Sequence, residues 1–105
     1  MAIEIENQEK DGDCLIKVTG EVDLYTSPEL RGAILKADPQ GGTSLGVDLS
    51  KVTYMDSSGV ATLVEGLKTA GQKRVEFVLV SPSPPVMKVL QLARLDTVFE
   101  IRDTM

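Results

Sequence analysis

The apolar residues of this 105-residue chain repeat with two different periods, and the period changes several times along the sequence. Near the N-terminus they alternate with polar residues, as Ile3 and Ile5 do around Glu4, which is typical of a half-buried strand. Further along they recur every three or four residues, as in an amphipathic helix. Repeated switching between the two periods favours an α/β domain over an all-helical or all-strand fold.

Turn residues divide this pattern into elements. Asp11 and Gly12 suit a tight hairpin, so the first two strands should be antiparallel. We expect strands at about residues 3–5, 14–18, 43–50, 75–80 and 98–101, and helices at about residues 26–37, 57–71 and 84–93. The order β-β-α-β-α-β-α-β predicts a single α/β domain over residues 1–105. Its mixed β-sheet should carry helices packed mainly on one face.

The expected helix boundaries depend on proline, serine and glycine. Ser27 before Pro28 indicates a first helix capped by Ser27, or alternatively by Thr26 in a capping box with Glu29. Residues 38–42 should end this helix, and Gly71 should end the second. In the third helix, Met87, Leu92 and Leu95 do not all fit the main apolar stripe. We expect them to pack at the helix end rather than form an exposed patch.

The composition argues against several classes of function. Sixteen acidic and 11 basic residues give a net charge of -5, so we expect no nucleic-acid partner. The N-terminus does not resemble a secretory signal, and no apolar run approaches a membrane span, which predicts a cytoplasmic protein without membrane insertion. There is no histidine, and Cys14, on an apolar strand phase, should be a core residue. We therefore expect no metal, no cofactor and no enzymatic activity.

The segment 51–63, KVTYMDSSGVATL, places two serines between an acidic residue and a glycine where a helix begins. Asp56 or Ser57 could simply cap the helix, while Gly59 relieves crowding. The helix start also favours anions, so a hydroxyl here could accept phosphate. Ser57 as a nucleophile lacks a histidine base, and the G-x-S-x-G pattern is absent. Tyr54 and Met55 should form the buried end of the loop that leads to the helix rather than a recognition surface.

Two segments, GEVDLYTSPEL (residues 20–30) and VDLSKVTYMDSSGVATL (residues 47–63), closely resemble the STAS domain of bacterial anti-sigma factor antagonists. The resemblance extends over nearly the whole chain, including VMKVLQLARLDTVFEI near the C-terminus. It implies that the first serine of the D-S-S-G segment, Ser57, is phosphorylated by a partner that is both a serine kinase and an anti-sigma factor. The unphosphorylated protein would bind that partner and free a sigma factor, and a PP2C-type phosphatase would reset it.

The resemblance also implies a partner-binding face around the phosphorylated serine. Its expected members are Asp23, Thr26, Asp56, Ser57, Ser58 and Gly59. Ser58 is expected to cap or pack rather than accept phosphate, since alanine often replaces it in relatives. Asp23 could equally serve as a turn or cap residue ahead of Thr26. For Gly59, a close approach of the kinase and a crowded helix start are equally good explanations.

Two other functions are considered beside the phosphorylation switch. A STAS subunit of an ABC transporter would dock on the ATPase subunit without a phosphorylation cycle, although the intact segment 56–59 weakens this alternative. A nucleotide-binding domain is the third, but the chain lacks a P-loop lysine motif and a Gly-rich dinucleotide turn. The sequence does not predict an oligomeric state.

Overall fold

The computed structural model describes residues 3–37, 39 and 43–105. Its strands are β1 (Ile3–Lys10), β2 (Asp13–Val22), β3 (Ser44–Met55), β4 (Glu76–Val80) and β5 (Glu100–Arg102). Its helices are α1 (Ser27–Lys36), α2 (Ser57–Gln72) and α3 (Pro84–Leu92). The predicted order β-β-α-β-α-β-α-β is therefore confirmed. The expected end of the first helix at residues 38–42 falls mostly outside the described residues, and α1 ends at Lys36.

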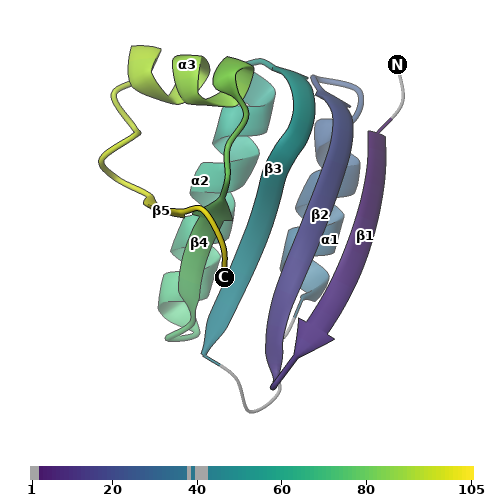
Figure 1. The fold of residues 1–105 in the computed structure, drawn as a ribbon, viewed down its shortest axis with the longest axis vertical. Coiled ribbons are helices and arrows are strands. Elements are labelled where there is room, and N and C mark those ends of the chain that lie inside the picture. The colour runs from purple at the N-terminus through teal and green to yellow at the C-terminus, as the bar shows by residue number, and fades with distance from the viewer. Residues whose placement is uncertain (1–2, 38, 40–42) are drawn as a thin grey trace.

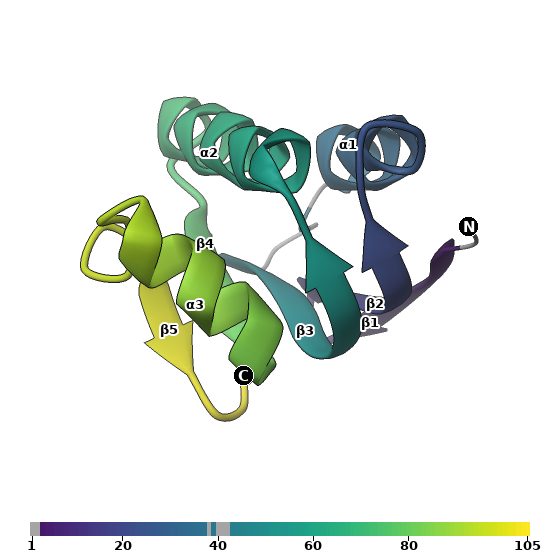
Figure 2. The same ribbon diagram turned by 90° about the horizontal axis from the view of Figure 1, so that it is seen from above.

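The strands form one mixed sheet in the order β1-β2-β3-β4-β5. β1 and β2 are antiparallel, and the turn between them contains Asp11 and Gly12 at φ angles of 54° and 86°, as the sequence predicts. The other three strand pairs are parallel. Figures 1 and 2 show α1 and α2 side by side on one face of the sheet, with α3 across its upper end. The expected packing of helices mainly on one face is thus confirmed.

The core lies between the sheet and α1 and α2. Ile16, Val47 and Leu63 are completely buried there, and Cys14 is a core residue as expected, with 7% of its surface exposed. The start of α3 is fixed to the middle strand, because the Ser83 hydroxyl donates to the carbonyl of Val52. This hydrogen bond joins the start of α3 to the same end of the sheet at which α2 begins (Figure 1).

The third strand is longer than expected and contradicts one prediction. β3 continues to Met55, so Tyr54 and Met55 belong to a strand and not to a loop. Met55 is buried, but Tyr54 is 49% exposed, and its expected burial is wrong. The cause is the continued pairing with β2, in which Tyr54 lies opposite Glu21 and Met55 opposite Val22. Adjacent strand residues point to opposite faces, so only Met55 reaches the core.

Three helix and strand ends also differ from the expected positions. α2 passes Gly71 and ends at Gln72, and the following positive φ angle belongs to Arg74, at 59°. Leu92 ends α3 with 76% of its surface exposed, so its expected packing at the helix end is wrong, whereas Met87 and Leu95 pack against the core. β5 begins at Glu100, two residues later than expected.

Candidate functional site

The candidate site lies where β2 and β3 both end and two helices begin. The Asp56 N–H donates to the carbonyl of Val22 over 3.2 Å, which joins the end of β2 to the start of α2. Parallel pairing brings the carboxyl ends of both strands to the same edge of the sheet. The loop 23–26 after β2 and the segment 56–59 after β3 are therefore neighbours at the upper end of the sheet in Figure 1.

Asp56 caps helix α2. One carboxylate oxygen, Oδ1, accepts the N–H of Ser58 over 2.9 Å and that of Gly59 over 3.4 Å. The same oxygen accepts the hydroxyl of Ser58. The Gly59 N–H also donates to the Asp56 carbonyl over 3.1 Å, so the carboxylate matters most for the Ser58 N–H, a first-turn donor that would otherwise depend on water. Of the two capping candidates, Asp56 and Ser57, the structure selects Asp56.

The two serines have different surroundings. Ser58 is half-buried, and its hydroxyl is held by Asp56. Ser57 is exposed, and neither its hydroxyl nor its N–H has a hydrogen-bond partner among the described residues. The first residue of α2 thus presents a hydroxyl to solvent at the positive end of the helix dipole.

Gly59 is buried in a crowded part of this helix start. A Cβ atom at Gly59 would lie 2.6 Å from Cγ of Met55 and 2.8 Å from Cγ1 of Val22. Both distances are too short for carbon atoms in contact, so α2 can approach β2 and β3 this closely only with glycine here. Of the two explanations for Gly59, packing therefore has direct support.

The loop after β2 is ordered by Asp23. Its Oδ1 accepts the N–H groups of Tyr25 over 2.9 Å and Thr26 over 3.0 Å. The Thr26 hydroxyl in turn accepts the Asp23 N–H over 2.9 Å and donates to the Glu21 carbonyl over 2.8 Å. The hydrogen bond from the Thr26 N–H, followed by the other hydrogen bonds, lowers the pKa of Asp23 below its ordinary value.

Thr26 occupies the N-cap position of α1, and Ser27 is already helical. Within the described chain no side chain caps this helix, so the capping box with Glu29 does not form. Thr26 is only 7% exposed, and its hydroxyl is used within the loop. Thr26 can therefore influence a partner only through the shape of the loop. Asp23 is half-buried and lies at the surface of the loop.

Three apolar side chains are exposed on the segments that lead to this site; the sequence patterns did not identify Leu24 and Tyr25, and they favoured burial of Tyr54 over a recognition surface. Leu24 is 68% exposed, Tyr25 88% and Tyr54 49%. Leu24 and Tyr25 belong to the loop held by Asp23, and Tyr54 is the residue before the last one of β3. The available signal was a pair of large apolar residues inside a turn, between Asp23 and Thr26.

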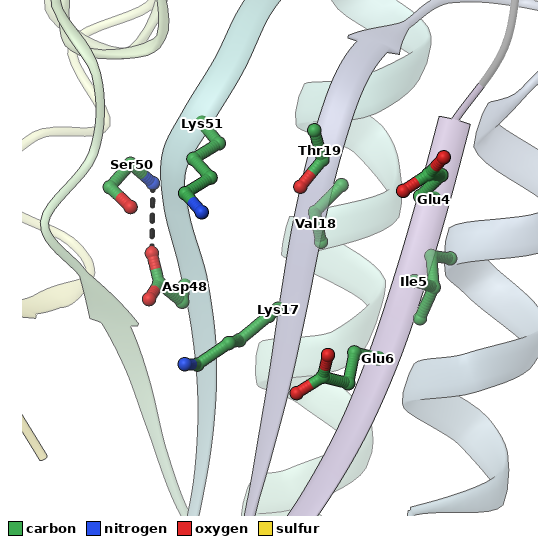
Figure 3. Close-up of a pocket in the computed structure, with 9 residues that line it drawn as sticks. All are labelled: Glu4, Ile5, Glu6, Lys17, Val18, Thr19, Asp48, Ser50 and Lys51. Atoms are coloured by element: carbon green, nitrogen blue, oxygen red, sulfur yellow. Dashed lines mark hydrogen bonds between the residues drawn. The ribbon is translucent and has the colours of Figure 1, made fainter.

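A second concave surface lies on the face of the sheet that α1 and α2 leave uncovered. Figure 3 shows its lining side chains on β1, β2 and β3, including Glu6, Lys17 and Asp48, which occupy neighbouring register positions. In the described part of the chain, no group of three or more acidic or cysteine side chains could hold a metal ion. The side chains that line this surface carry charges of both signs.

Comparison with known proteins identifies the fold and the family. The sequence family described as "Mlab, STAS domain" matches residues 5–102. The chain belongs to the STAS domain family. An anti-sigma-B factor antagonist from Listeria monocytogenes is 35% identical over 104 residues, covering 98% of this chain and 91% of the relative. This STAS chain is thus similar in sequence to anti-sigma factor antagonists over almost its full length.

Solved structures of similar proteins agree with this assignment. An anti-sigma factor antagonist from Mycobacterium paratuberculosis has a TM-score of 0.85 and 29% identity, covering 99% of this chain and 88% of that one. The Bacillus cell fate determinant SpoIIAA in its phosphorylated form has a TM-score of 0.69 and 26% identity, covering 95% of this chain and 90% of that one. Among the described residues, no helix is long and apolar enough to cross a membrane.

Proposed function

We propose that this STAS protein is an anti-sigma factor antagonist whose partner binding is switched by phosphorylation of Ser57. In this proposal the whole chain, residues 1–105, acts as one domain in the cytoplasm. Unphosphorylated protein binds an anti-sigma factor that is also a serine kinase, and the sigma factor is released. Phosphorylation of Ser57 dissociates the complex, and a PP2C-type phosphatase removes the phosphate so that the protein can bind its partner again.

The observation that carries this proposal is the different environment of the two serines. Ser57 is exposed with a hydroxyl that no described residue holds, whereas the Ser58 hydroxyl is bound to Asp56. A kinase needs access to the acceptor oxygen and freedom to align it with the transferred phosphate. Ser57 meets both requirements without a change of the backbone. The phosphorylated form of SpoIIAA, which is similar to this chain, is consistent with a phosphate on this fold.

A phosphate on Ser57 would act on the interface rather than on the fold. It adds about 1.5 to 2 negative charges at neutral pH. The N–H of Ser57 and the dipole of α2 favour this charge, although the neighbouring carboxylate of Asp56 already occupies the N–H groups of Ser58 and Gly59. A kinase bound at this site holds the phosphates of its nucleotide opposite Ser57. A phosphate already on Ser57 would meet that negative charge and occupy the same space.

The remaining predicted partner-binding residues divide into two groups in this proposal. Asp23 lies at the loop surface and is available for direct contact. Thr26 and Gly59 are buried, and Asp56 and Ser58 hold each other, so these four residues shape the contact surface. Substitutions in this second group should therefore change partner binding only where they alter the local backbone.

Binding measurements with the kinase test this function. Full-length Ser57→Ala serves as bait in an extract of the host supplied with ATP, because it cannot be phosphorylated and released. We expect it to retain a serine kinase that, once purified, binds Ser57→Ala and unmodified wild type equally. Ser57→Asp should bind at least tenfold more weakly, since it reproduces part of the charge of phosphoserine. Recovery of a transporter ATPase whose binding is insensitive to Ser57→Asp would instead support a transporter subunit.

A further inference from the structure

The phosphorylation switch does not explain three exposed apolar residues at the ends of the two strands that lead to the candidate site. Leu24, Tyr25 and Tyr54, hereafter the tyrosine patch, lie at the ends of β2 and β3 where segment 56–59 begins. Tyr25 is the most exposed of them, at 88%. Large side chains of this kind usually contribute to the core or to an interface, and tyrosine is among the residues enriched at binding hot spots. Phosphate transfer itself requires only the hydroxyl of Ser57.

The loop that presents Tyr25 is held in place before any partner arrives. The N–H of Tyr25 donates to Asp23, and the Thr26 hydroxyl connects the loop to the Glu21 carbonyl. The Ser27 N–H also donates to the Asp23 carbonyl over 2.8 Å. An anchor on an ordered loop loses little backbone freedom on binding, which lowers the entropic cost of association.

On the segments that carry or border the tyrosine patch, acidic residues outnumber basic ones, although Lys51 lies on the same strand as Tyr54. Glu21, Asp23, Glu29 and Asp56 all lie on the segments that carry the patch or border it. Hydrogen bonds to the loop N–H groups keep the pKa of Asp23 low, so its charge persists at neutral pH. The cation on the next turn of α1, Arg31, forms an ion pair of 2.8 Å with Glu65 and is directed toward α2. The apolar patch therefore has an acidic rim.

We propose that the tyrosine patch is the docking anchor for the kinase, which receives Tyr25 in an apolar pocket bordered by basic side chains. This inference rests on the proposed function and adds a division of roles. The tyrosine patch supplies affinity, the acidic rim guides association, and Ser57 decides whether the complex persists. Complementary charge selects a basic partner surface, because a second copy of this chain would bring another acidic rim against the first.

Steady-state phosphorylation kinetics separate docking from catalysis. The probe is the purified kinase captured on Ser57→Ala, with full-length Tyr25→Ala as substrate and saturating ATP. We expect the KM for the substrate to rise about 30-fold, the fold-change of a hot-spot truncation of about 2 kcal/mol, while kcat stays within about twofold. The control is Leu92→Ala, which removes another exposed apolar side chain at the far end of α3 and should leave both constants unchanged.

The possible outcomes distinguish the docking inference from the proposed function. Normal phosphorylation of Ser57 with an unchanged KM for folded Tyr25→Ala would overturn the inference and leave the function standing. If the kinase does not phosphorylate wild type, the proposed function is wrong, and the docking inference that rests on it is wrong as well. If wild type sediments as a dimer and Tyr25→Ala as a monomer, the patch joins two copies and the kinase-docking assignment is wrong. Slower association of Glu29→Lys at low salt, with the difference lost at high salt, would support the acidic rim.

Discussion

At the scale of single residues, two aspartates give the site its shape. Asp23 and Asp56 each follow the end of a strand and use one carboxylate oxygen to hold N–H groups of the next residues. Asp56 also fixes the hydroxyl of Ser58, which leaves Ser57 as the accessible hydroxyl of the pair. The helix cap formed by Asp56 therefore determines which of the two adjacent serines has an accessible hydroxyl.

Replacement of Asp56 tests this cap. Asp56→Ala should lower the free energy of unfolding by about 0.5 to 2 kcal/mol, because the N–H and hydroxyl of Ser58 lose their acceptor, whereas the Gly59 N–H keeps the backbone carbonyl of residue 56. Asp56→Asn retains a capping oxygen and should cost only a few tenths of a kcal/mol. Urea denaturation of the two variants measures the difference. Equal stability of Asp56→Ala and wild type would show that the cap contributes nothing.

The loop at Asp23 should respond to acid. Hydrogen bonds to the Thr26 and Tyr25 N–H groups lower the folded-state pKa of Asp23 below its ordinary value of 3.8. The loop is therefore stabilised above that ordinary value, and the stabilisation is lost as the pH falls through the lowered pKa. Hydrogen exchange should show that the Tyr25 and Thr26 amides become less protected as the pH falls from about 3.8 through the lowered pKa of Asp23. Asp23→Asn, which keeps an acceptor but does not ionise, should lose the pH dependence of this protection.

At the scale of secondary-structure elements, the approach of α2 to β2 and β3 positions Ser57, and Gly59 allows that approach. Gly59→Ala should destabilise the protein by about 1 kcal/mol. Overpacking against Met55 and Val22 costs about 1 to 3 kcal/mol, and this cost is partly offset because replacing a helical glycine by alanine stabilises the helix by about 1 kcal/mol. Gly71→Ala is the matched control, since nothing lies within 4 Å of its new Cβ. It should stabilise the protein by about 0.5 to 1 kcal/mol. Thermal unfolding of both variants should shift Tm in opposite directions, and a common direction would contradict this packing account.

The sequence predicted the element order because most strands and helices keep one period and end at recognisable turn residues. β3 is the instructive exception. In its pairing with β2, Asp48 and Lys51 lie opposite Lys17 and Thr19, so β3 has one residue more than β2 between these two pairs. Leu49 and Val52 are consequently both buried although three positions separate them, and the alternation that identifies a strand stops at residue 50.

The candidate site was predictable where it depends on local backbone chemistry. Asp56 and Ser57 could be placed at a helix start because acidic and hydroxyl residues before an apolar helical stripe indicate an N-terminus. The exposure of Leu24 and Tyr25 could not be predicted, because an apolar residue in a turn can fold onto the core or away from it. The hydrogen bonds of Asp23 and Thr26, which the structure shows, hold the loop in the conformation that exposes these two side chains.

At the scale of the whole molecule, the switch should leave the fold unchanged. Ser57→Asp places a negative charge at the exposed N-terminus of α2, where the helix dipole is favourable and no described hydrogen bond is lost. We expect its free energy of unfolding to stay within about 1 kcal/mol of wild type. A loss of cooperative thermal unfolding would contradict a switch confined to the surface.

The central claim is that Ser57 is the phosphate acceptor of a binding switch. The most direct measurement is mass spectrometry of the intact protein and its peptides after incubation with the captured kinase and ATP. The account predicts one added phosphate, mapped to Ser57, with no addition to Ser57→Ala and normal addition to Ser58→Ala. Phosphate mapped to Ser58, Ser50 or Thr53, or undiminished phosphorylation of Ser57→Ala, would contradict it.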